Sequence, residues 1–443
     1  MIQQICSLLQ DKRILILGFG REGKSTYHFL RKYFPDKIIG IYDQKGVREP
    51  MANTVLYKGD CYEELLSQYD LIIKSPGIVL NLEDEQILTK FTSQTDLFLQ
   101  FYSAQTIGIT GTKGKSTTSS LLFHVLSHSN KEAILVGNIG VPVFDTLEKI
   151  SENTLVVFEL SSHQLEYVTH SPHFGVLLNI FQEHLDHYGT FEKYKEAKEN
   201  IYKYQCKGDI LLYNPDFYQL QEACEAETIT ITNHTEKADV VVKENQIVLQ
   251  TEVLTINENE INLMGNHNIY NIAVTYAIAK TYGVSQESFM EAIKTFQPLP
   301  HRMEYVAELN GVKYYNDSIS TICETTMNNV DSVDNVDTVI LGGMDRGIDY
   351  LPLVNFLVDS DIRNVILMPD TGYRIQKLLL QCDKKREDQN LFMVSGVEEA
   401  VEVAKRETKK DMTCLFSPAA ASYGFFKNFE ERGETFKRLV LGK

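Results

Sequence analysis

Residues 109–117 read Ile-Thr-Gly-Thr-Lys-Gly-Lys-Ser-Thr, and this stretch decides how the chain around it folds. The apolar run Thr106–Ile109 predicts a buried strand, and a helix is predicted from Ser116 onward. Glycines between a strand and a helix allow backbone amides to face a phosphate, and the helix N-terminus adds partial positive charge. We therefore predict a phosphate-binding loop, in which Lys115 contacts the β- and γ-phosphates of a nucleotide and Ser116 ligates Mg²⁺.

The spacing of this loop differs from the standard Walker pattern, in which a glycine stands five residues before the Gly-Lys pair. Gly108 stands six residues before Gly114, so the loop has a shorter form. A plain glycine turn with a surface lysine is the alternative interpretation, but the order of strand, loop and helix favours ATP binding. The predicted contacts are Gly111, Thr112, Lys113, Gly114, Lys115, Ser116 and Thr117.

A second glycine-rich turn, Gly18 to Gly23, follows the apolar run Arg13–Leu17 and has the pattern Gly-x-Gly-x-x-Gly. A turn of this kind after a first strand can bind a dinucleotide, a nucleotide sugar or nothing. Asp43 follows the next predicted strand, Ile38–Tyr42, and suits a ribose contact. We expect nucleotide binding here and disfavour a redox dinucleotide.

Apolar runs alternate with helix-length polar segments along the whole chain, which is typical of parallel sheets covered by helices. Further buried strands are predicted at Leu71–Ile73, Leu155–Phe158, Gly175–Leu178, Thr338–Leu341, Val365–Met368 and Thr413–Phe416. Between residues 208 and 263 the period shifts toward two, most clearly at Thr228–Ile231. We expect a small antiparallel elaboration there.

The clearest linker is Phe296–Pro300, because its two prolines deny helix and ladder hydrogen bonds. The predicted class is α/β, with three domains that are each built on a mainly parallel sheet covered by helices. We predict a Rossmann-like domain at 1–104, a P-loop ATPase-like domain at 105–298 and a second Rossmann-like domain at 299–443.

The composition is that of an ordinary globular protein, with 43% hydrophobic and 23% charged residues among 443. The formal net charge of -17 disfavours a nucleic-acid surface, which needs a basic stripe. The chain shows neither a signal peptide nor a run of about 18 apolar residues that would span a membrane. Its seven cysteines form no CxxC pair, which argues for a reducing compartment. We expect a cytoplasmic protein.

Several separated motifs accompany the phosphate loop. They are Gly137-Asn138-Ile139-Gly140, Glu159-Leu160-Ser161-Ser162-His163-Gln164-Leu165-Glu166, Glu183-His184-Leu185-Asp186-His187-Tyr188, His267-Asn268-Ile269-Tyr270-Asn271, His301-Arg302-Met303-Glu304, Asn316-Asp317-Ser318, Leu341-Gly342-Gly343-Met344-Asp345-Arg346-Gly347, Leu415-Phe416-Ser417-Pro418-Ala419-Ala420-Ala421-Ser422 and Phe426-Lys427-Asn428-Phe429-Glu430 with Arg432-Gly433. Each motif alone is weak, but their order and spacing are specific. With them the chain resembles the Mur ligases over essentially its whole length.

The resemblance implies an ATP-dependent ligase of bacterial cell-wall precursor synthesis. The implied reaction joins glutamate, with the D-isomer favoured, to UDP-N-acetylmuramoyl-L-alanine through an acyl phosphate. The implied cofactors are ATP, Mg²⁺ as two ions, and CO₂ held as a carbamate on Lys198. The implied partners are these small molecules, without nucleic acid or membrane, and a monomer is expected.

The resemblance also assigns roles to single residues. The implied catalytic residues are Lys115, His184 and Lys198. The nucleotide is implied to contact Asn271, Arg302 and Asp317 in addition to the phosphate loop. The UDP-substrate site is implied at Gly18, Phe19, Gly20, Asp43, Ser75, Pro76, Gly77 and Asn138. The amino-acid site is implied at Thr321, Arg346, Ser422 and Phe429. The implied metal ligands are Ser116, Glu159, His184 and, when carbamylated, Lys198.

Plain structural alternatives exist for five of these residues. Glu159 ends a predicted buried strand, where a metal would compensate its charge, and the alternative is a carboxylate paired with a helix or a lysine. Lys198 lies in a charge-rich helical segment, which by itself favours a solvated salt bridge. His184 fits a satisfied loop histidine, and Arg302 fits a salt bridge in the linker. Asp317 fits the cap of a helix that begins directly after it.

One position departs from the family pattern. Ile319 follows Asp317-Ser318 where the family usually has lysine, which removes a cation near the predicted amino-acid and phosphate sites. Arg346 offers a bidentate partner for a glutamate carboxylate. A related group of ligases that adds L-glutamate to the same acceptor shares an Asp-Ser-Ile pattern. The isomer therefore stays open, with D-glutamate favoured.

Three other functions compete with this interpretation. A folylpolyglutamate synthetase would share the phosphate loop but not the motifs after residue 415. A non-catalytic nucleotide-binding regulator is supported by Ile319 and opposed by Glu159, His184 and Lys198. A dehydrogenase would use the first glycine-rich turn but leaves Lys115 unexplained.

Overall fold

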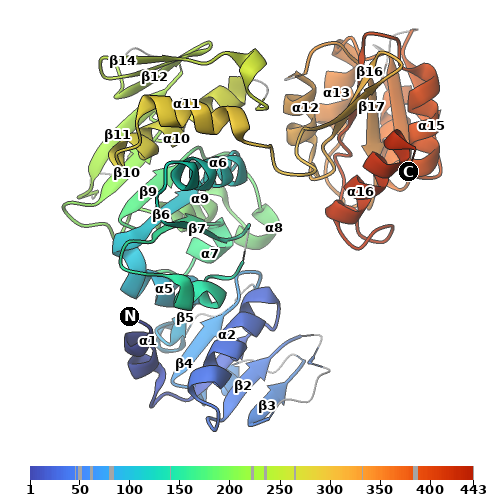
Figure 1. The fold of residues 1–443 in the computed structure, drawn as a ribbon. Coiled ribbons are helices and arrows are strands. Elements are labelled where there is room, and N and C mark those ends of the chain that lie inside the picture. The colour runs from blue at the N-terminus through green and yellow to red at the C-terminus, as the bar shows by residue number, and fades with distance from the viewer. Residues whose placement is uncertain are drawn as a thin grey trace. The chain divides into compact units, whose positions relative to one another are not determined.

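The computed structural model describes residues 1–44, 46–47, 52–59, 63–78, 84–139, 141–220, 224–233, 237–263, 266–331, 333–382 and 388–442 (Figure 1). Cys61 of the cysteine set and Gly140 of the first motif lie outside the described residues. The described part contains three sheets covered by helices, which confirms the predicted α/β class.

The first sheet has the strand order β3-β2-β1-β4-β5, and its neighbouring strands all run parallel. β1 lies in the middle and is buried along its whole length, as its apolar run predicts. The elements of this part are α1 (Ile2–Leu9), β1 (Ile14–Leu17), α2 (Arg21–Tyr33), β2 (Ile39–Tyr42), β3 (Thr54–Tyr57), α3 (Glu63–Ser67), β4 (Leu71–Lys74), α4 (Glu85–Leu88), β5 (Phe91–Thr92) and α5 (Gln94–Tyr102).

The second sheet has the order β14-β13-β12-β11-β10-β9-β6-β8-β7. β6 stands between β8 and β9, parallel to both. The elements are η1 (Ser103–Gln105), β6 (Thr106–Thr110), α6 (Lys115–His128), β7 (Ala133–Gly137), η2 (Val143–Lys149), β8 (Leu155–Glu159), α7 (Ser162–Leu165), β9 (Phe174–Leu177), α8 (Leu185–Tyr188), α9 (Phe191–Glu199), β10 (Ile210–Tyr213), β11 (Glu227–Thr232), β12 (Val240–Lys243), β13 (Gln246–Leu249), β14 (Glu252–Thr255), η3 (Glu258–Glu260), α10 (Asn266–Thr281) and α11 (Gln286–Thr295).

The predicted antiparallel elaboration between residues 208 and 263 is only partly right. β11, which holds the alternating run Thr228–Ile231, pairs parallel with both β10 and β12 and so extends the main sheet. Antiparallel pairing is confined to β12, β13 and β14. The prediction went wrong at β11 because period-two alternation reports which face of a strand is exposed, not the direction of its neighbour.

The first two sheets share one hydrophobic core. Phe98 of α5 stacks on Tyr102 with ring centroids 4.6 Å apart, and its ring meets Phe158 of β8 edge-on at 5.7 Å. Phe29 of α2 meets Phe144 of η2 at 4.7 Å. This shared core explains why residues 1–260 and 267–296 form one compact unit.

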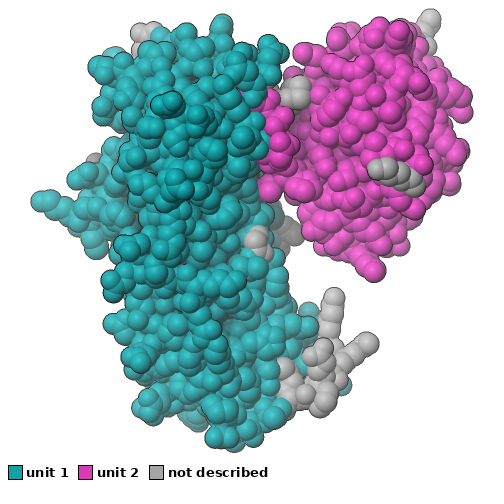
Figure 2. All heavy atoms as spheres, viewed as in Figure 1, with its two compact units in different colours: residues 1–260, 267–296 teal, residues 261–266, 297–443 magenta. Residues whose placement is uncertain are grey.

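The second compact unit comprises residues 261–266 and 297–443 (Figure 2). Its sheet has the order β15-β16-β20-β17-β18-β19, in which only the edge strand β15 is antiparallel to its neighbour. The elements are β15 (Glu304–Leu309), β16 (Val312–Asn316), α12 (Cys323–Asp331), β17 (Val336–Gly342), α13 (Leu351–Asp359), β18 (Asn364–Met368), α14 (Thr371–Gln381), β19 (Asn390–Met393), α15 (Val397–Glu407), β20 (Thr413–Phe416) and α16 (Phe429–Leu441). One core cluster joins the sheet to α12, α13 and α14, and another joins it to α15 and α16.

The finer division into domains at 1–104, 105–298 and 299–443 stays a prediction. The two units change over after Phe296, inside the predicted linker. Within the described ranges, every helix is too short or too polar to cross a lipid bilayer.

Candidate functional site

The phosphate loop lies at the carboxyl end of β6, where backbone conformation depends on two glycines. Gly111 and Gly114 have φ of +155° and +87°, and residues that carry a side chain rarely adopt these backbone conformations. A Cβ at Gly114 would stand 2.7 Å from the Asn271 side-chain oxygen, so glycine lets α10 approach the loop. Thr118 Oγ1 donates to the same oxygen at 3.2 Å. The structure therefore brings the predicted nucleotide residue Asn271 to the loop.

Asn179, directly after β9, holds the loop from the other side. Its side-chain oxygen accepts from the backbone amides of Thr112 at 3.0 Å and Lys113 at 2.8 Å. Its side-chain amide donates to the Lys113 carbonyl at 3.1 Å. Asn179 was not among the residues predicted from sequence. The available signal was its place at the end of a buried strand that pairs with β6.

Two lysine amines converge on the carbonyl oxygen of Gly111. Lys115 Nζ donates to it at 2.8 Å and to the Thr112 carbonyl at 2.9 Å. Lys198 Nζ donates to it at 2.8 Å and lies 4.9 Å from the centre of the Tyr194 ring. Both predicted catalytic lysines are therefore held against the same turn of the loop.

Lys198 is buried, with 1% of its surface exposed. The solvated salt bridge that its charge-rich segment favours is therefore wrong. Thr190 caps α9 by accepting from the Lys193 amide, and the helix turns Tyr194, Ala197 and Lys198 inward. Burial, with the charge of Lys115 nearby, holds the pKa of the Lys198 amine well below that of an ordinary lysine.

Glu159 is fully buried at the end of β8, as predicted. Its Oε1 accepts from Ser116 Oγ at 3.2 Å and from Asn138 Nδ2 at 2.9 Å. Its Oε2 is buried and has no hydrogen-bond partner among the described residues. A buried carboxylate oxygen without a donor is costly, so this arrangement fits a cation.

The chemistry of these donors selects the kind of cation. Hydroxyl and carboxylate oxygens are the ligands that Mg²⁺ takes, and Mg²⁺ is usually held by one or two protein groups together with substrate phosphates. In the described part, no three His, Cys, Asp or Glu side chains form a complete metal cage. Ser116 and Glu159 beside a phosphate loop therefore fit Mg²⁺ that arrives with a nucleotide.

His184 lies in a turn of left-handed backbone conformation, with its ring centroid 6.0 Å from that of Tyr194. Its φ is +56°, and its Nε2 lies 3.9 Å from Glu183 Oε2. Glu183 Oε1 in turn accepts from Lys113 Nζ at 2.7 Å, which ties the turn to the phosphate loop. The imidazole of His163 packs 4.9 Å from that of His184. His184 therefore has partners, and its predicted role as a metal ligand stays a prediction.

The first glycine-rich turn is assembled with its predicted partners. The Gly18 carbonyl accepts from Ser75 Oγ at 2.8 Å, and the Phe19 amide donates to Asp43 Oδ2 at 3.0 Å. Gly20 is the N-cap of α2. Pro76 and Gly77 follow Ser75 in the turn after β4. Asp43 thus shapes the turn by taking one of its amides.

Arg21 and Gln164 link this turn to the second sheet, and neither was predicted as a site residue. Arg21 Nη2 donates to the Gly137 carbonyl at 2.7 Å, next to Asn138. Gln164 Nε2 donates to Glu22 Oε1 at 2.7 Å. The predicted UDP-substrate residue Asn138 is therefore adjacent to both the glycine turn and Glu159.

Asp317 lies in the second unit and is fully buried. Its carboxylate accepts from Ser417 Oγ and Asn329 Nδ2, each at 2.6 Å, and from the Met303 amide at 3.3 Å. α12 begins only at Cys323, so the helix cap considered for Asp317 is wrong. Burial raises the pKa of this carboxyl. Its predicted nucleotide contact, like that of Arg302, stays a prediction.

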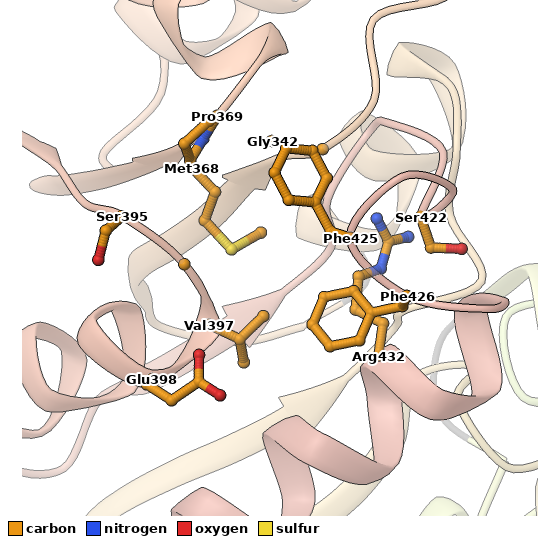
Figure 3. Close-up of a pocket in the computed structure, with 12 residues that line it drawn as sticks. Gly342, Met368, Pro369, Ser395, Val397, Glu398, Ser422, Phe425, Phe426 and Arg432 are labelled. Carbon is orange, nitrogen blue, oxygen red and sulfur yellow. The ribbon is translucent and has the colours of Figure 1, made fainter.

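Three of the four predicted amino-acid residues stand on loops at the carboxyl edge of the third sheet, and the fourth begins the helix that follows one of these loops. Thr321 follows β16, Arg346 follows β17, Ser422 follows β20, and Phe429 begins α16. A pocket of about 240 Å³ opens at this edge (Figure 3). The structure describes all four residues, and among them only Ser422 lines this pocket.

Comparison with known proteins agrees with this architecture. The family model for the Mur ligase middle domain matches residues 109–279. A UDP-N-acetylmuramoylalanine–D-glutamate ligase of Clostridioides difficile (strain 630) is 32% identical over 451 residues, which cover 98% of this chain and 99% of the relative. A protein of the same name from Geobacter sp. (strain M21) is 33% identical, with 98% of each chain covered.

Solved structures show the same fold. The UDP-N-acetylmuramate–alanine ligase of Thermotoga maritima superposes with a TM-score of 0.61 at 17% identity, over 98% of this chain and 100% of that one. MurF from Acinetobacter baumannii superposes with a TM-score of 0.62 at 14% identity, over 100% and 99%.

The half-buried His163 gives a prediction about acid stability. Burial, with His187 and His184 nearby, lowers its pKa from 6.5 to about 3. Between these values the unfolded chain binds a proton that the folded chain does not, so acid favours unfolding by up to about 1.4 kcal/mol per pH unit. His163→Gln should therefore flatten the fall in unfolding free energy below pH 6.5, as measured by urea titration.

The exposed His28 supplies the matched control, and His28→Gln should leave the profile unchanged. A His163→Gln profile that parallels the parent profile from pH 8 to pH 5 would contradict the prediction.

Proposed function

The chain belongs to the Mur ligase family, and from this premise we propose that it joins D-glutamate to UDP-N-acetylmuramoyl-L-alanine at the expense of ATP. Two observations at the phosphate loop carry the proposal. Lys115 and Lys198 both donate to the Gly111 carbonyl, and the buried Glu159 has one oxygen without a hydrogen-bond partner among the described residues. The names of relatives that match 98% of the chain at 32–33% identity support the substrates. We further propose a cytoplasmic monomer that acts on small molecules.

The reaction requires activation because a carboxylate and an amine form a salt at neutral pH, not an amide. In the first step, the carboxylate oxygen of the acceptor attacks the γ-phosphorus of ATP. The bond to the bridging oxygen breaks, ADP leaves, and an acyl phosphate forms. In the second step, the glutamate amine attacks the acyl carbon, phosphate leaves, and the amine gives up a proton.

Two anions approach each other in the first step, so catalysis depends on positive charge at the phosphoryl oxygens. The N-terminus of α6 offers fixed donors, because the first amides of a helix have no partner within the helix. Lys115 would have to exchange its bonds to the Gly111 and Thr112 carbonyls for bonds to phosphate oxygens. Bound Mg²⁺, held by Ser116 and Glu159, would neutralise further charge on the nucleotide.

Lys198 is suited to react with CO₂. Carbamate formation needs a neutral amine, and burial that lowers the pKa of Lys198 increases the neutral fraction at physiological pH. The product is an anion, which would turn a like-charge neighbour of Lys115 into an opposite-charge partner. It would also add oxygen ligands for a second Mg²⁺ near Glu159.

The proposal also includes a choice between D-glutamate and L-glutamate. Ile319 lies where the family usually has lysine, and its amide donates to the His301 carbonyl at 3.1 Å. Arg346 is exposed on the loop after β17 and offers a guanidinium for a glutamate carboxylate. The curated relatives named above carry D-glutamate in their names, and this supports the D-isomer.

We predict that purified protein releases ADP with UDP-N-acetylmuramoyl-L-alanine and D-glutamate, with kcat/KM at least about tenfold above that for L-glutamate. Lys115→Ala should lower turnover by roughly 100-fold or more, because it removes a cation from the transferring phosphoryl group. Lys131→Ala, at a partly exposed position in the turn after α6, should leave turnover unchanged. Faster turnover with L-glutamate would reverse the assigned isomer, and ADP release with neither isomer would overturn the function.

We predict that Lys198 carries a carbamate in the working enzyme. With ¹³C-labelled bicarbonate, the nuclear magnetic resonance spectrum should show a carbamate signal that is absent from Lys198→Gln and retained in Lys193→Gln, the control at an exposed lysine of the same helix. Removal of CO₂ should lower turnover reversibly. A spectrum without a signal that depends on Lys198, together with full turnover in CO₂-free buffer, would contradict the carbamate.

A further inference from the structure

Arg432, in the first turn of α16, is the largest fully buried side chain among the described residues, with 1% of its surface exposed. A buried guanidinium is costly unless hydrogen bonds compensate for lost hydration. Burial lowers its pKa to about 10, so the group keeps its charge at neutral pH. A guanidinium that is buried at such a cost in free energy points to a functional role.

The bonds of Arg432 reach two loops that are far apart in sequence. Its Nε donates to Ser318 Oγ at 3.1 Å, and its Nη2 donates to the Ser318 carbonyl at 2.7 Å. Its Nη1 donates to the Ala420 carbonyl at 3.0 Å. Ser318 Oγ passes the connection on by donating to the Phe429 carbonyl at 2.8 Å. One planar group therefore fixes the loops after β16 and β20 to the start of α16.

The three residues that this network connects, Ser318, Ala420 and Phe429, lie at or next to the proposed amino-acid residues. Ser318 precedes Thr321 by three residues, Ala420 precedes Ser422 by two, and Phe429 is itself one of them. The Arg432 side chain also reaches the wall of the pocket, on the side of Ser422 (Figure 3). A Cβ on Gly343, in the loop before Arg346, would stand 3.0 Å from Arg432 Nη1. Glycine there leaves room for the guanidinium.

We propose that Arg432 is a positioning residue for the amino-acid site, which it builds by locking three separate chain segments in one register. The inference rests on the proposed function. Arg432 does not need to touch the amino acid. Its role requires the planar fork of donors and not charge alone, because its acceptors are two carbonyl oxygens and a hydroxyl.

The experiment measures KM for glutamate, ATP and the UDP-substrate, together with kcat, in the intact protein and in Arg432→Lys. Lysine keeps the positive charge, but its ammonium group lacks the planar set of donors with which the guanidinium reaches its separated acceptors. We expect KM for glutamate to rise about tenfold, the equivalent of one lost charge-assisted hydrogen bond. KM for ATP and for the UDP-substrate should change less than about twofold. Arg438→Lys, at an exposed position of the same helix, should change none of these values.

A second variant keeps the test decisive if Arg432→Lys does not fold. Ser318→Ala removes one acceptor and the bond to Phe429, and it should raise KM for glutamate about threefold with the other two constants unchanged. Unchanged KM for glutamate, or an equal rise in all three constants, would overturn the positioning role. Parent protein that shows no glutamate-dependent turnover would instead overturn the proposed function itself.

Discussion

The structure depends on compensating charges that are buried under the phosphate loop. Glu159 and Lys198 are both out of contact with water, and each would destabilise the fold if left alone. The loop supplies part of the compensation, since the Gly111 carbonyl accepts from Lys198, and Ser116 and Asn138 donate to one Glu159 oxygen. The second Glu159 oxygen is left for a cation. Under the proposed function, a metal-bound nucleotide would compensate this oxygen.

The parallel sheet explains why these groups meet. β6, β8 and β9 are neighbours, so the phosphate loop, Glu159 and Asn179 all emerge at the same carboxyl edge. α9 then closes the group from one side and brings Lys198 to the loop. The first glycine turn is joined to this edge through Arg21 and Gly137, which places the two predicted nucleotide sites in one unit. The meeting of these predicted site residues is therefore a consequence of strand order.

Much of this could be predicted from sequence, because glycine loops and buried strands have strong local signals. The ends of β6, β8 and β9 were predicted to within one residue, and Glu159 was predicted as a strand-end carboxylate. Lys198 could not be understood locally, because its segment reads as a charged surface helix and only tertiary packing buries it. Asn179 was missed since a single asparagine after a strand has no distinctive pattern. The direction of β11 relative to its neighbours could not be predicted either, because the alternation of exposed and buried side chains does not specify the direction of a neighbouring strand. The contacts of Arg432 join residues 114 positions apart, which no local pattern reveals.

The most direct test concerns the unmatched Glu159 oxygen. Isothermal titration calorimetry should compare ATP binding with Mg²⁺ and with chelator, in the parent protein and in Glu159→Gln. If this oxygen holds the cation, Mg²⁺ should tighten ATP binding by about tenfold or more in the parent protein and by far less in the variant. An equal gain from Mg²⁺ in both proteins would contradict the account, because the cation would then bind without the buried carboxylate.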